Sequence, residues 1–304
     1  MSFDSVGRRV SPVAFAVSVV LVLAADVSIA AEAAPPGFDY DRAAPLDVRE
    51  GKATRPPREV LVRDLTYLRL SGGRNGATLV SPRTPPRGLR PALLFVHWYE
   101  PESPTSNRGQ FLEEAIGLAR SGAVSLLVDT MWSDPKWFPS RTPADDLPNS
   151  IAQVKELRRA LDVLTARPGV DPKRVAYVGH DFGAMYGALL GGSDGRPAAY
   201  VLMAGTKSFS DWFLLGRKLQ GEAREAVVRE LSVLDPARHV GAVAPAPVLF
   251  QFARKDHFVP EADAQAFFAG AREPKELRWY DAGHGLNDEA AHDRVAWLKA
   301  KLGL

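Results

Sequence analysis

The pentapeptide GHDFG, at residues 179–183, places an acidic side chain at the apex of a tight turn. The apolar run before it predicts a buried strand, and the run after it predicts a helix. Gly179 and Gly183 flank Asp181, and small residues are needed there because a strand that turns directly into a helix bends sharply. Asp181 would then project over the strand end, toward the first N–H groups of the helix. It is a candidate nucleophile, although aspartate is also a favoured helix N-cap that needs no chemistry.

Two further candidate residues follow predicted strands downstream of Asp181. Asp256 comes after the apolar run PVLFQFA, and His284 comes after LRWYDAG. Each alone also fits an ordinary loop position, Asp256 as a solvated acid and His284 as a surface histidine. Strand ends are where the sites of open α/β sheets form, and nucleophile, acid, histidine is the chain order of a hydrolytic triad. Together the three residues predict a catalytic triad of Asp181, His284 and Asp256.

Strand-like and helix-like segments alternate from residue 58 onward and would position these residues. Segments 59–70 and 75–82 alternate like half-buried strands. Continuous apolar runs are typical of strands buried on both faces, and amphipathic runs between them predict covering helices. The buried strands are expected at 91–97, 123–129, 174–179, 198–205, 246–253 and 276–283, and the helices at 111–122, 150–167, 182–192, 261–271 and 289–302. This order predicts an α/β fold with a mostly parallel sheet and helices on both faces.

From about residue 58 to the C-terminus the chain resembles the α/β-hydrolase superfamily, and particularly its dienelactone-hydrolase-like members. The resemblance is carried by the blocks DPKRVAYVGHDFG, PVLFQFARKDHFVP and YDAGHG. It implies an eight-stranded sheet with Asp181 as nucleophile, Asp256 as acid and His284 as base. Dienelactone hydrolases use cysteine at the first position and related esterases use serine. Aspartate there resembles the epoxide hydrolases and haloalkane dehalogenases of the same superfamily.

The chemistry of a carboxylate nucleophile favours alkyl over acyl substrates. Attack of Asp181 on an ester would expel an alkoxide far more basic than the attacking group, so the intermediate would collapse backwards. Attack on a carbon that bears a halide, or on a strained epoxide, would instead give a stable alkyl ester. His284, oriented by Asp256, would then activate water to cleave that ester. We therefore expect a covalent alkyl-enzyme intermediate.

The loop FVHWYEP after the third strand is the expected source of the oxyanion hole. Backbone N–H groups of Trp98 or Tyr99, together with that of Phe182, would form it. His97 either orients this loop or is an ordinary core histidine. Phe182 stands where dehalogenases of this type often have tryptophan, so an epoxide is preferred over a haloalkane.

Aromatic residues in two other segments are candidates for the substrate pocket. Trp132 and Trp137 lie in a loop after a predicted strand, where they would either reach the site or pack within the loop. Phe209 and Trp212 lie near the start of a short lid expected at about 206–245. These two either cover an apolar substrate or pack on the sheet.

The N-terminal region has a different composition. Arg8 and Arg9 precede an apolar run that ends in small residues, so residues 1–33 are expected to be a secretory signal peptide. Asp26 interrupts the run, which is short for a membrane span. A Pro-rich arm is expected at 34–57, followed by a single α/β-hydrolase domain at 58–304. The mature protein would be periplasmic or secreted, with no membrane association, and the absence of cysteine means that no disulfide stabilises it.

Composition narrows the possible partners. The net charge of +2 and the scattered basic residues do not favour a nucleic-acid partner. The six histidines show no metal-binding spacing, and no glycine-rich phosphate loop is present, so no metal and no cofactor are expected. The first hypothesis is an exported hydrolase of a small apolar substrate, an epoxide before a haloalkane. The alternatives are a carboxylic-ester or lactone hydrolase and a non-catalytic binding protein of the same fold.

Overall fold

The computed structural model describes the chain except for residues 3–36, 55–58, 85–86 and 104–105. Apart from its first two residues, the predicted signal peptide therefore lies outside the described residues. None of the helices in the described part is long and apolar enough to cross a membrane.

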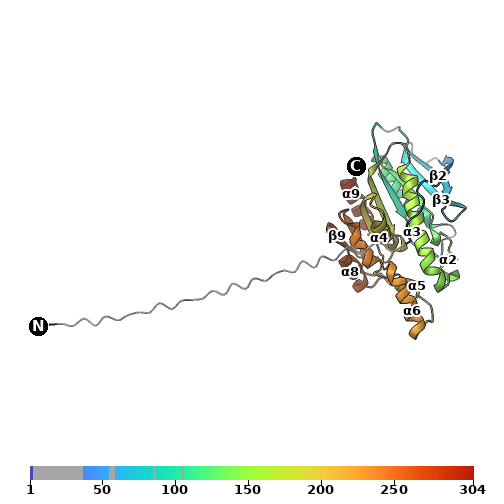
Figure 1. The fold of residues 1–304 in the computed structure, drawn as a ribbon. Coiled ribbons are helices and arrows are strands. Elements are labelled where there is room, and N and C mark those ends of the chain that lie inside the picture. Colours follow the sequence, from blue (N-terminus) through green and yellow to red (C-terminus); the bar gives the residue numbers. More distant parts are fainter. Residues whose placement is uncertain (3–36, 55–58, 85–86, 104–105) are drawn as a thin grey trace. The chain divides into compact units, whose positions relative to one another are not determined.

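The described strands form one nine-stranded sheet in the order β1-β2-β3-β5-β4-β6-β7-β8-β9. Figure 1 shows β2 and β3 on one side of the sheet and β9 on the other. The first strands pair antiparallel, up to the β3–β5 pair, and every later pair is parallel. The strands are β1 (Arg49–Thr54), β2 (Val60–Leu68), β3 (Arg74–Pro82), β4 (Arg90–Val96), β5 (Val124–Val128), β6 (Val170–His180), β7 (Pro197–Met203), β8 (Val248–Ala253) and β9 (Lys275–Tyr280). The mostly parallel α/β sheet predicted from the sequence is confirmed.

The expected count of eight strands is wrong, because β1 adds one. Its sequence REGKAT lies within the stretch expected to be a Pro-rich arm, and it pairs with β2 at the edge of the sheet. Residues 49–53 are exposed. An edge strand with no buried face needs no apolar alternation, so the sequence pattern carried no signal for it.

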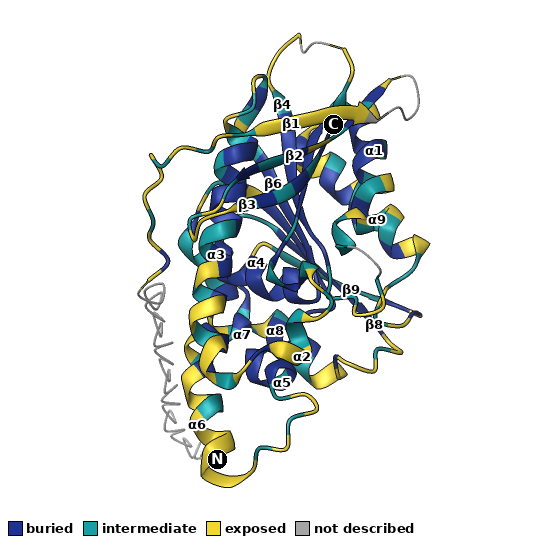
Figure 2. Cartoon of the chain, turned by 90° about the vertical axis from the view of Figure 1, so that its right-hand side faces the viewer, coloured by how far each residue is buried: buried dark blue, intermediate teal, exposed yellow. Residues whose placement is uncertain are grey.

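Helices cover both faces of the sheet (Figure 2). The long helices are α1 (Leu112–Arg120), α3 (Pro143–Thr165), α4 (Phe182–Ser193), α6 (Gly221–Leu231), α8 (Glu261–Gly270) and α9 (Asp288–Leu302). The short ones are η1 (Asn107–Phe111), η2 (Met131–Ser133), α2 (Trp137–Ser140), α5 (Phe209–Phe213), η3 (Ser232–Leu234), α7 (Pro236–His239) and η4 (Val240–Val243). Side chains alternate along β4: Leu93 and Phe95 pack with α1 and α9, whereas Leu94 and Val96 pack with α3, α4 and α8.

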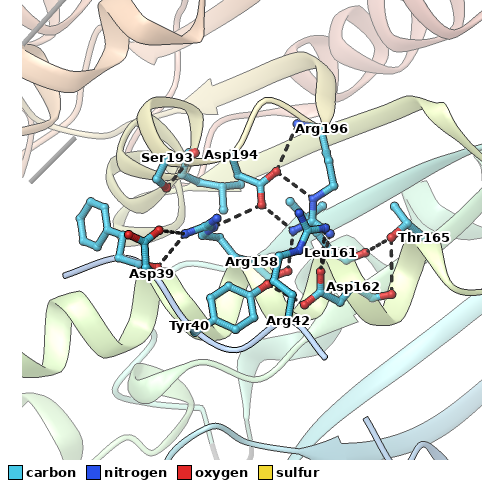
Figure 3. A network of polar contacts seen from close by, with 12 residues as sticks. Asp39, Tyr40, Arg42, Arg158, Leu161, Asp162, Thr165, Ser193, Asp194 and Arg196 are labelled. Carbon is cyan, nitrogen blue, oxygen red and sulfur yellow. Dashed lines mark hydrogen bonds and ion pairs between the residues drawn. The ribbon is translucent and has the colours of Figure 1, made fainter. Parts of the chain in front are cut away.

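The described part of the N-terminal arm packs against α3 through a polar network (Figure 3). The hydroxyl of Tyr40 donates to Asp162 Oδ2 at 2.6 Å, and Arg158 Nη1 donates to the carbonyl oxygen of Phe38 at 2.6 Å. Arg196, beyond α4, bridges Asp162 and Asp194. Phe38 itself is buried in the core. These contacts fix the arm to the same helix that covers the central strands.

Candidate active site

Asp181 sits at a strained turn between β6 and α4. Its backbone has φ 61° and ψ −121°, a conformation that is rare for any residue other than glycine. A Cβ on Gly179 would collide with the carbonyl oxygen of Gly183, and one on Gly183 would collide with that of Val96. The two glycines are thus required by close backbone packing, as the sequence predicted. The turn holds Asp181 at the carboxyl edge of the parallel strands.

The carboxylate of Asp181 does not cap the helix that follows it. No side-chain capping hydrogen bond is formed; instead Oδ2 accepts the backbone N–H of Tyr99 at 2.8 Å. The side chain is buried, with 5% of the residue exposed. Burial raises the pKa of Asp181 to about 7, and the charge of His284 and the N–H groups of Tyr99 and Phe182 offset part of that rise. Asp181 is therefore a desolvated carboxylate held by backbone donors.

His284 is oriented by Asp256. Its Nδ1 lies 2.9 Å from Asp256 Oδ2, while Oδ1 of the same carboxylate accepts the backbone N–H groups of Phe258 at 2.8 Å and Val259 at 3.1 Å. Since a carboxylate accepts, Nδ1 carries the hydrogen and Nε2 keeps its lone pair as a base. Burial lowers the pKa of His284, but the hydrogen bond to Asp256 and the negative charge of Asp181 raise it overall.

One cavity brings Asp181 and His284 together. Its volume is about 160 Å³, and apolar side chains make up most of its wall. The lining residues are Tyr99, Pro101, Phe138, Asp181, Phe182, Trp212, Leu215, Phe258 and His284. Trp212 is the member of the predicted pocket set that lines it. Four other lining residues were not predicted from the sequence: Pro101, Phe138, Leu215 and Phe258. Of these four, only Phe258 could have been expected near the site from the sequence, because it lies two residues after the predicted acid Asp256.

Three residues predicted to line the pocket do not. His97 is buried, with Nδ1 2.6 Å from the carbonyl oxygen of Trp98 and Nε2 2.9 Å from Ser133 Oγ. Trp132 is buried and donates its indole N–H to the carbonyl oxygen of His97 at 3.0 Å. Phe209 is fully buried and packs on Tyr186 with ring centroids 4.8 Å apart. All three are core or loop-packing residues, because their polar and apolar contacts are satisfied within the fold.

Trp137 also falls outside this cavity. Its ring makes edge contacts with two residues that line the cavity, Phe182 and Phe138, with ring centroids 5.5 Å and 5.8 Å away. It lines a separate, more polar cavity next to Asn75 and Glu156. Trp137 therefore supports two lining residues and does not reach the cavity of Asp181.

Of the two N–H groups expected to contribute to the oxyanion hole from the loop after β4, only one faces Asp181. The N–H of Tyr99 points to Asp181, but that of Trp98 donates to Gln110 Oε1 at 2.9 Å, so Trp98 supplies no donor to the site. The ring of Trp98 instead stacks on His284, with an interplanar angle of 4° and centroids 5.8 Å apart. Tyr99 is the loop residue placed to pair with Phe182.

A buried histidine links the two loops of the site. His180 Nε2 lies 2.9 Å from the carbonyl oxygen of His284, and its Nδ1 lies 2.6 Å from Gln110 Nε2. The carbonyl requires a donor and the amide nitrogen provides one, so His180 is the neutral tautomer with hydrogen on Nε2. Burial, and then the charge of His284, hold the pKa of His180 well below its usual range. This series of hydrogen bonds, from His284 through His180 and Gln110 to Trp98, connects the loop that carries His284 to the loop that carries Trp98 and Tyr99.

We predict that Gln110→Ala lowers turnover about tenfold while leaving substrate affinity nearly unchanged, because it frees the loop that carries the Tyr99 N–H. Gln110→Glu should lower it as well, since an ionised carboxylate cannot donate to His180 Nδ1. Steady-state measurement of kcat and KM separates the effect on turnover from the effect on substrate affinity. Glu113→Ala, on the first turn of α1, is the matched control and should be silent. A rise in KM alone, or equal loss in the control, would contradict the positioning role.

The pKa shifts predict that activity is lost on the acid side. In the covalent mechanism predicted from the sequence, Asp181 would have to be ionised to attack, and its pKa is raised to about 7; His284 would have to be neutral to activate water, and its pKa is raised as well. Both groups lose the proton as pH rises, so kcat/KM should climb through an apparent pKa of about 7 that belongs to the pair. A profile of kcat/KM against pH measures this. A profile that is flat between about pH 5 and pH 8 would contradict it.

No protein-family model matches the chain. A curated relative, the uncharacterized protein YfhR of Salmonella typhi, is 22% identical over 203 residues, which cover 57% of this chain and 68% of that protein.

Solved structures show greater similarity in shape. An acetyl xylan esterase from Paenibacillus sp. R4 matches 84% of this chain and 89% of its own, with a TM-score of 0.71 and 20% identity. Acetyl xylan esterase 1 from Thermoanaerobacterium sp. JW/SL YS485 matches 86% and 91%, with a TM-score of 0.72 and 17% identity. A putative dienelactone hydrolase from Klebsiella pneumoniae subsp. pneumoniae MGH 78578 matches 84% and 98%, with a TM-score of 0.55 and 16% identity.

These likenesses show the α/β-hydrolase fold. Within this fold, the chain places Asp181 at a strained turn and holds His284 and Asp256 as a hydrogen-bonded pair. Among the described residues, no group of three or more metal-ligating side chains lies together.

Proposed function

We propose that this chain is an exported hydrolase that opens an epoxide through a covalent ester on Asp181, without a cofactor. The observation that carries this proposal is the hydrogen bond from the Tyr99 N–H to Asp181 Oδ2 at 2.8 Å. One carboxylate oxygen occupies the oxyanion position, which leaves Oδ1 as the attacking atom. An ester substrate would need that same position for its own carbonyl oxygen. The arrangement therefore favours attack on an alkyl carbon.

The reaction would proceed in two displacements. Asp181 Oδ1 attacks an epoxide carbon from the side opposite the C–O bond; that bond breaks, and its electron pair stays on the oxygen, which takes a proton from solvent water. His284 Nε2 then takes a proton from a second water, whose oxygen attacks Cγ of Asp181. The charge that develops on Oδ2 is stabilised by the N–H groups of Tyr99 and Phe182. Collapse breaks the bond between Cγ and Oδ1, and the departing oxygen takes the proton held by His284, so that the diol leaves. The new carboxyl group returns its proton to solvent, which restores the carboxylate.

A departing halide is the second candidate leaving group, and one observation is compatible with it. Trp212 lines the cavity, and its buried indole N–H has no hydrogen-bond partner among the described residues. Such a donor would stabilise either a halide or an epoxide oxygen. The ester or lactone hydrolase alternative rests on the structural likeness to the acetyl xylan esterases.

A single turnover in water enriched in heavy oxygen tests the proposal. With enzyme in excess over an epoxide, the product should contain oxygen from Asp181 and no label, while the label enters the Asp181 carboxylate. Peptide mass spectrometry reads the second result. Label in the product of the first turnover would show direct attack by water and overturn the covalent mechanism. Turnover of esters alone would favour the alternative hydrolase, and turnover of nothing would favour a binding protein.

A further inference from the structure

The mouth of the cavity is apolar and exposed. The lining residues fall into a buried end, with Asp181 and Phe182, and an exposed end, with Pro101, Leu215 and Phe258. Leu215 is 53% exposed and Phe258 is 54% exposed. Every exposed residue of the lining is therefore apolar.

Scattered exposed apolar residues are ordinary in proteins, but these two are not scattered. Leu215 lies two residues after the end of the short helix α5, and Phe258 belongs to the loop held by Asp256 Oδ1, so they approach one opening from different elements. The ring of Phe258 makes an edge contact with the ring of His284, with centroids 5.1 Å apart. The ring of Trp212 makes a second edge contact with His284, with centroids 6.0 Å apart. An apolar path therefore runs from His284 to the surface.

The cavity is too small to enclose a large substrate. Its volume of about 160 Å³ lies below the roughly 300 Å³ at which pockets for drug-sized ligands begin. The polar groups in its lining are also few. Apart from Asp181 and His284, the lining has the Tyr99 hydroxyl, which already donates to the carbonyl oxygen of Pro135 at 2.9 Å, and the buried indole N–H of Trp212. At the exposed end, the side chains of Pro101, Leu215 and Phe258 offer no partner to a polar tail on the substrate, whereas an apolar chain would be covered on its way out.

We infer that the substrate is a terminal alkyl compound whose reacting carbon enters the cavity and whose unbranched apolar chain leaves between Leu215 and Phe258. This inference rests on the proposed function, because it takes the cavity of Asp181 as the substrate site. It goes further by assigning chain-length selectivity to two residues outside the triad. Each methylene group covered by the mouth should strengthen binding about twofold to fourfold.

Binding of unbranched primary alcohols from about four to about ten carbons tests the inference without any reaction, by calorimetry on the full chain. Leu215→Ser and Phe258→Ala should each flatten the dependence of Kd on chain length, losing about fivefold to tenfold for the longest alcohol and about twofold or less for the shortest. Leu89→Ser is the matched control. Leu89 is 58% exposed but does not line the cavity, and its substitution should leave the dependence unchanged.

The outcomes separate this inference from the proposed reaction. Equal loss of affinity for short and long alcohols in both variants, or a Kd that does not change with chain length in the wild type, would overturn the inference. Chain-length-dependent binding without turnover of any epoxide would leave the inference standing and overturn the reaction. Where epoxides are turned over, kcat/KM for terminal epoxides of increasing chain length should follow the same dependence. The unfolding temperature of each variant reports whether it is folded.

Discussion

A His284→Ala variant incubated with its substrate is expected to gain the mass of that substrate on Asp181. In the proposed reaction the first displacement needs the carboxylate and not the histidine, whereas cleavage of the ester needs a base. Turnover should fall on the order of 10³-fold, within the range of general base catalysis. Intact-protein mass spectrometry measures the adduct, and peptide mapping locates it. Epoxides, haloalkanes and esters are offered separately, so the mass gained also identifies the substrate class.

Conditions matter for this trapping experiment. The positive charge of His284 lowers the pKa of Asp181, so its removal should raise that pKa further above about 7. The variant is therefore best incubated near about pH 9, where Asp181 is ionised. His292→Ala, on the outer part of α9, is the matched control and should form no adduct while retaining activity. Absence of an adduct from every class, together with wild-type turnover of esters, would contradict the alkyl-enzyme mechanism.

Asp181→Asn is expected to abolish turnover, by on the order of 10⁴-fold or more, and to form no adduct. The amide oxygen can still accept the Tyr99 N–H, so the turn should keep its geometry while losing the nucleophile. Steady-state kinetics and mass spectrometry give both readouts. Residual activity above about one per cent would show that Asp181 is not the attacking group.

The same variant should be more stable than the wild type at high pH only. Burial raises the pKa of Asp181 from 3.8 to about 7, so its ionisation opposes folding by up to roughly 4 kcal/mol at pH values above both. Below about pH 4 the carboxyl is protonated in folded and unfolded chains, and the gain should vanish. Urea unfolding at several pH values measures the difference. A gain that does not depend on pH would show that Asp181 has an ordinary pKa.

Local sequence patterns were enough to predict the α/β sheet and several of the residues that meet at its carboxyl edge. Apolar runs located the buried strands, because both faces of β4 to β8 must be covered, and their positions agree closely with those observed. The glycines around Asp181 predicted the sharp turn. Residues after the last two strands predicted the His284–Asp256 pair, since parallel strands bring their carboxyl ends to one edge. These inferences depend on local pattern and chain order alone.

Other features depend on contacts between distant segments, and the sequence pattern did not predict them. The polar edge strand β1 was missed because its pairing partner, not its own sequence, places it in the sheet. The start of α3 at Pro143 lies before the predicted residue 150, because Thr142 and Asp145 form a capping box ahead of the apolar pattern.

The residues of the cavity wall show most clearly the difference between features that local sequence patterns predict and features that tertiary contacts decide. Trp132 and Leu215 could not be assigned from their types, because an aromatic or aliphatic residue in a loop fits a core and a pocket equally well. Trp132 is buried by its neighbours, whereas Leu215 is exposed and lies at the mouth of the cavity. Likewise Trp98 and Tyr99 are adjacent, and only the position of Gln110 on a separate helix decides which N–H faces Asp181. Side-chain direction follows from packing between elements, which a single sequence pattern does not encode.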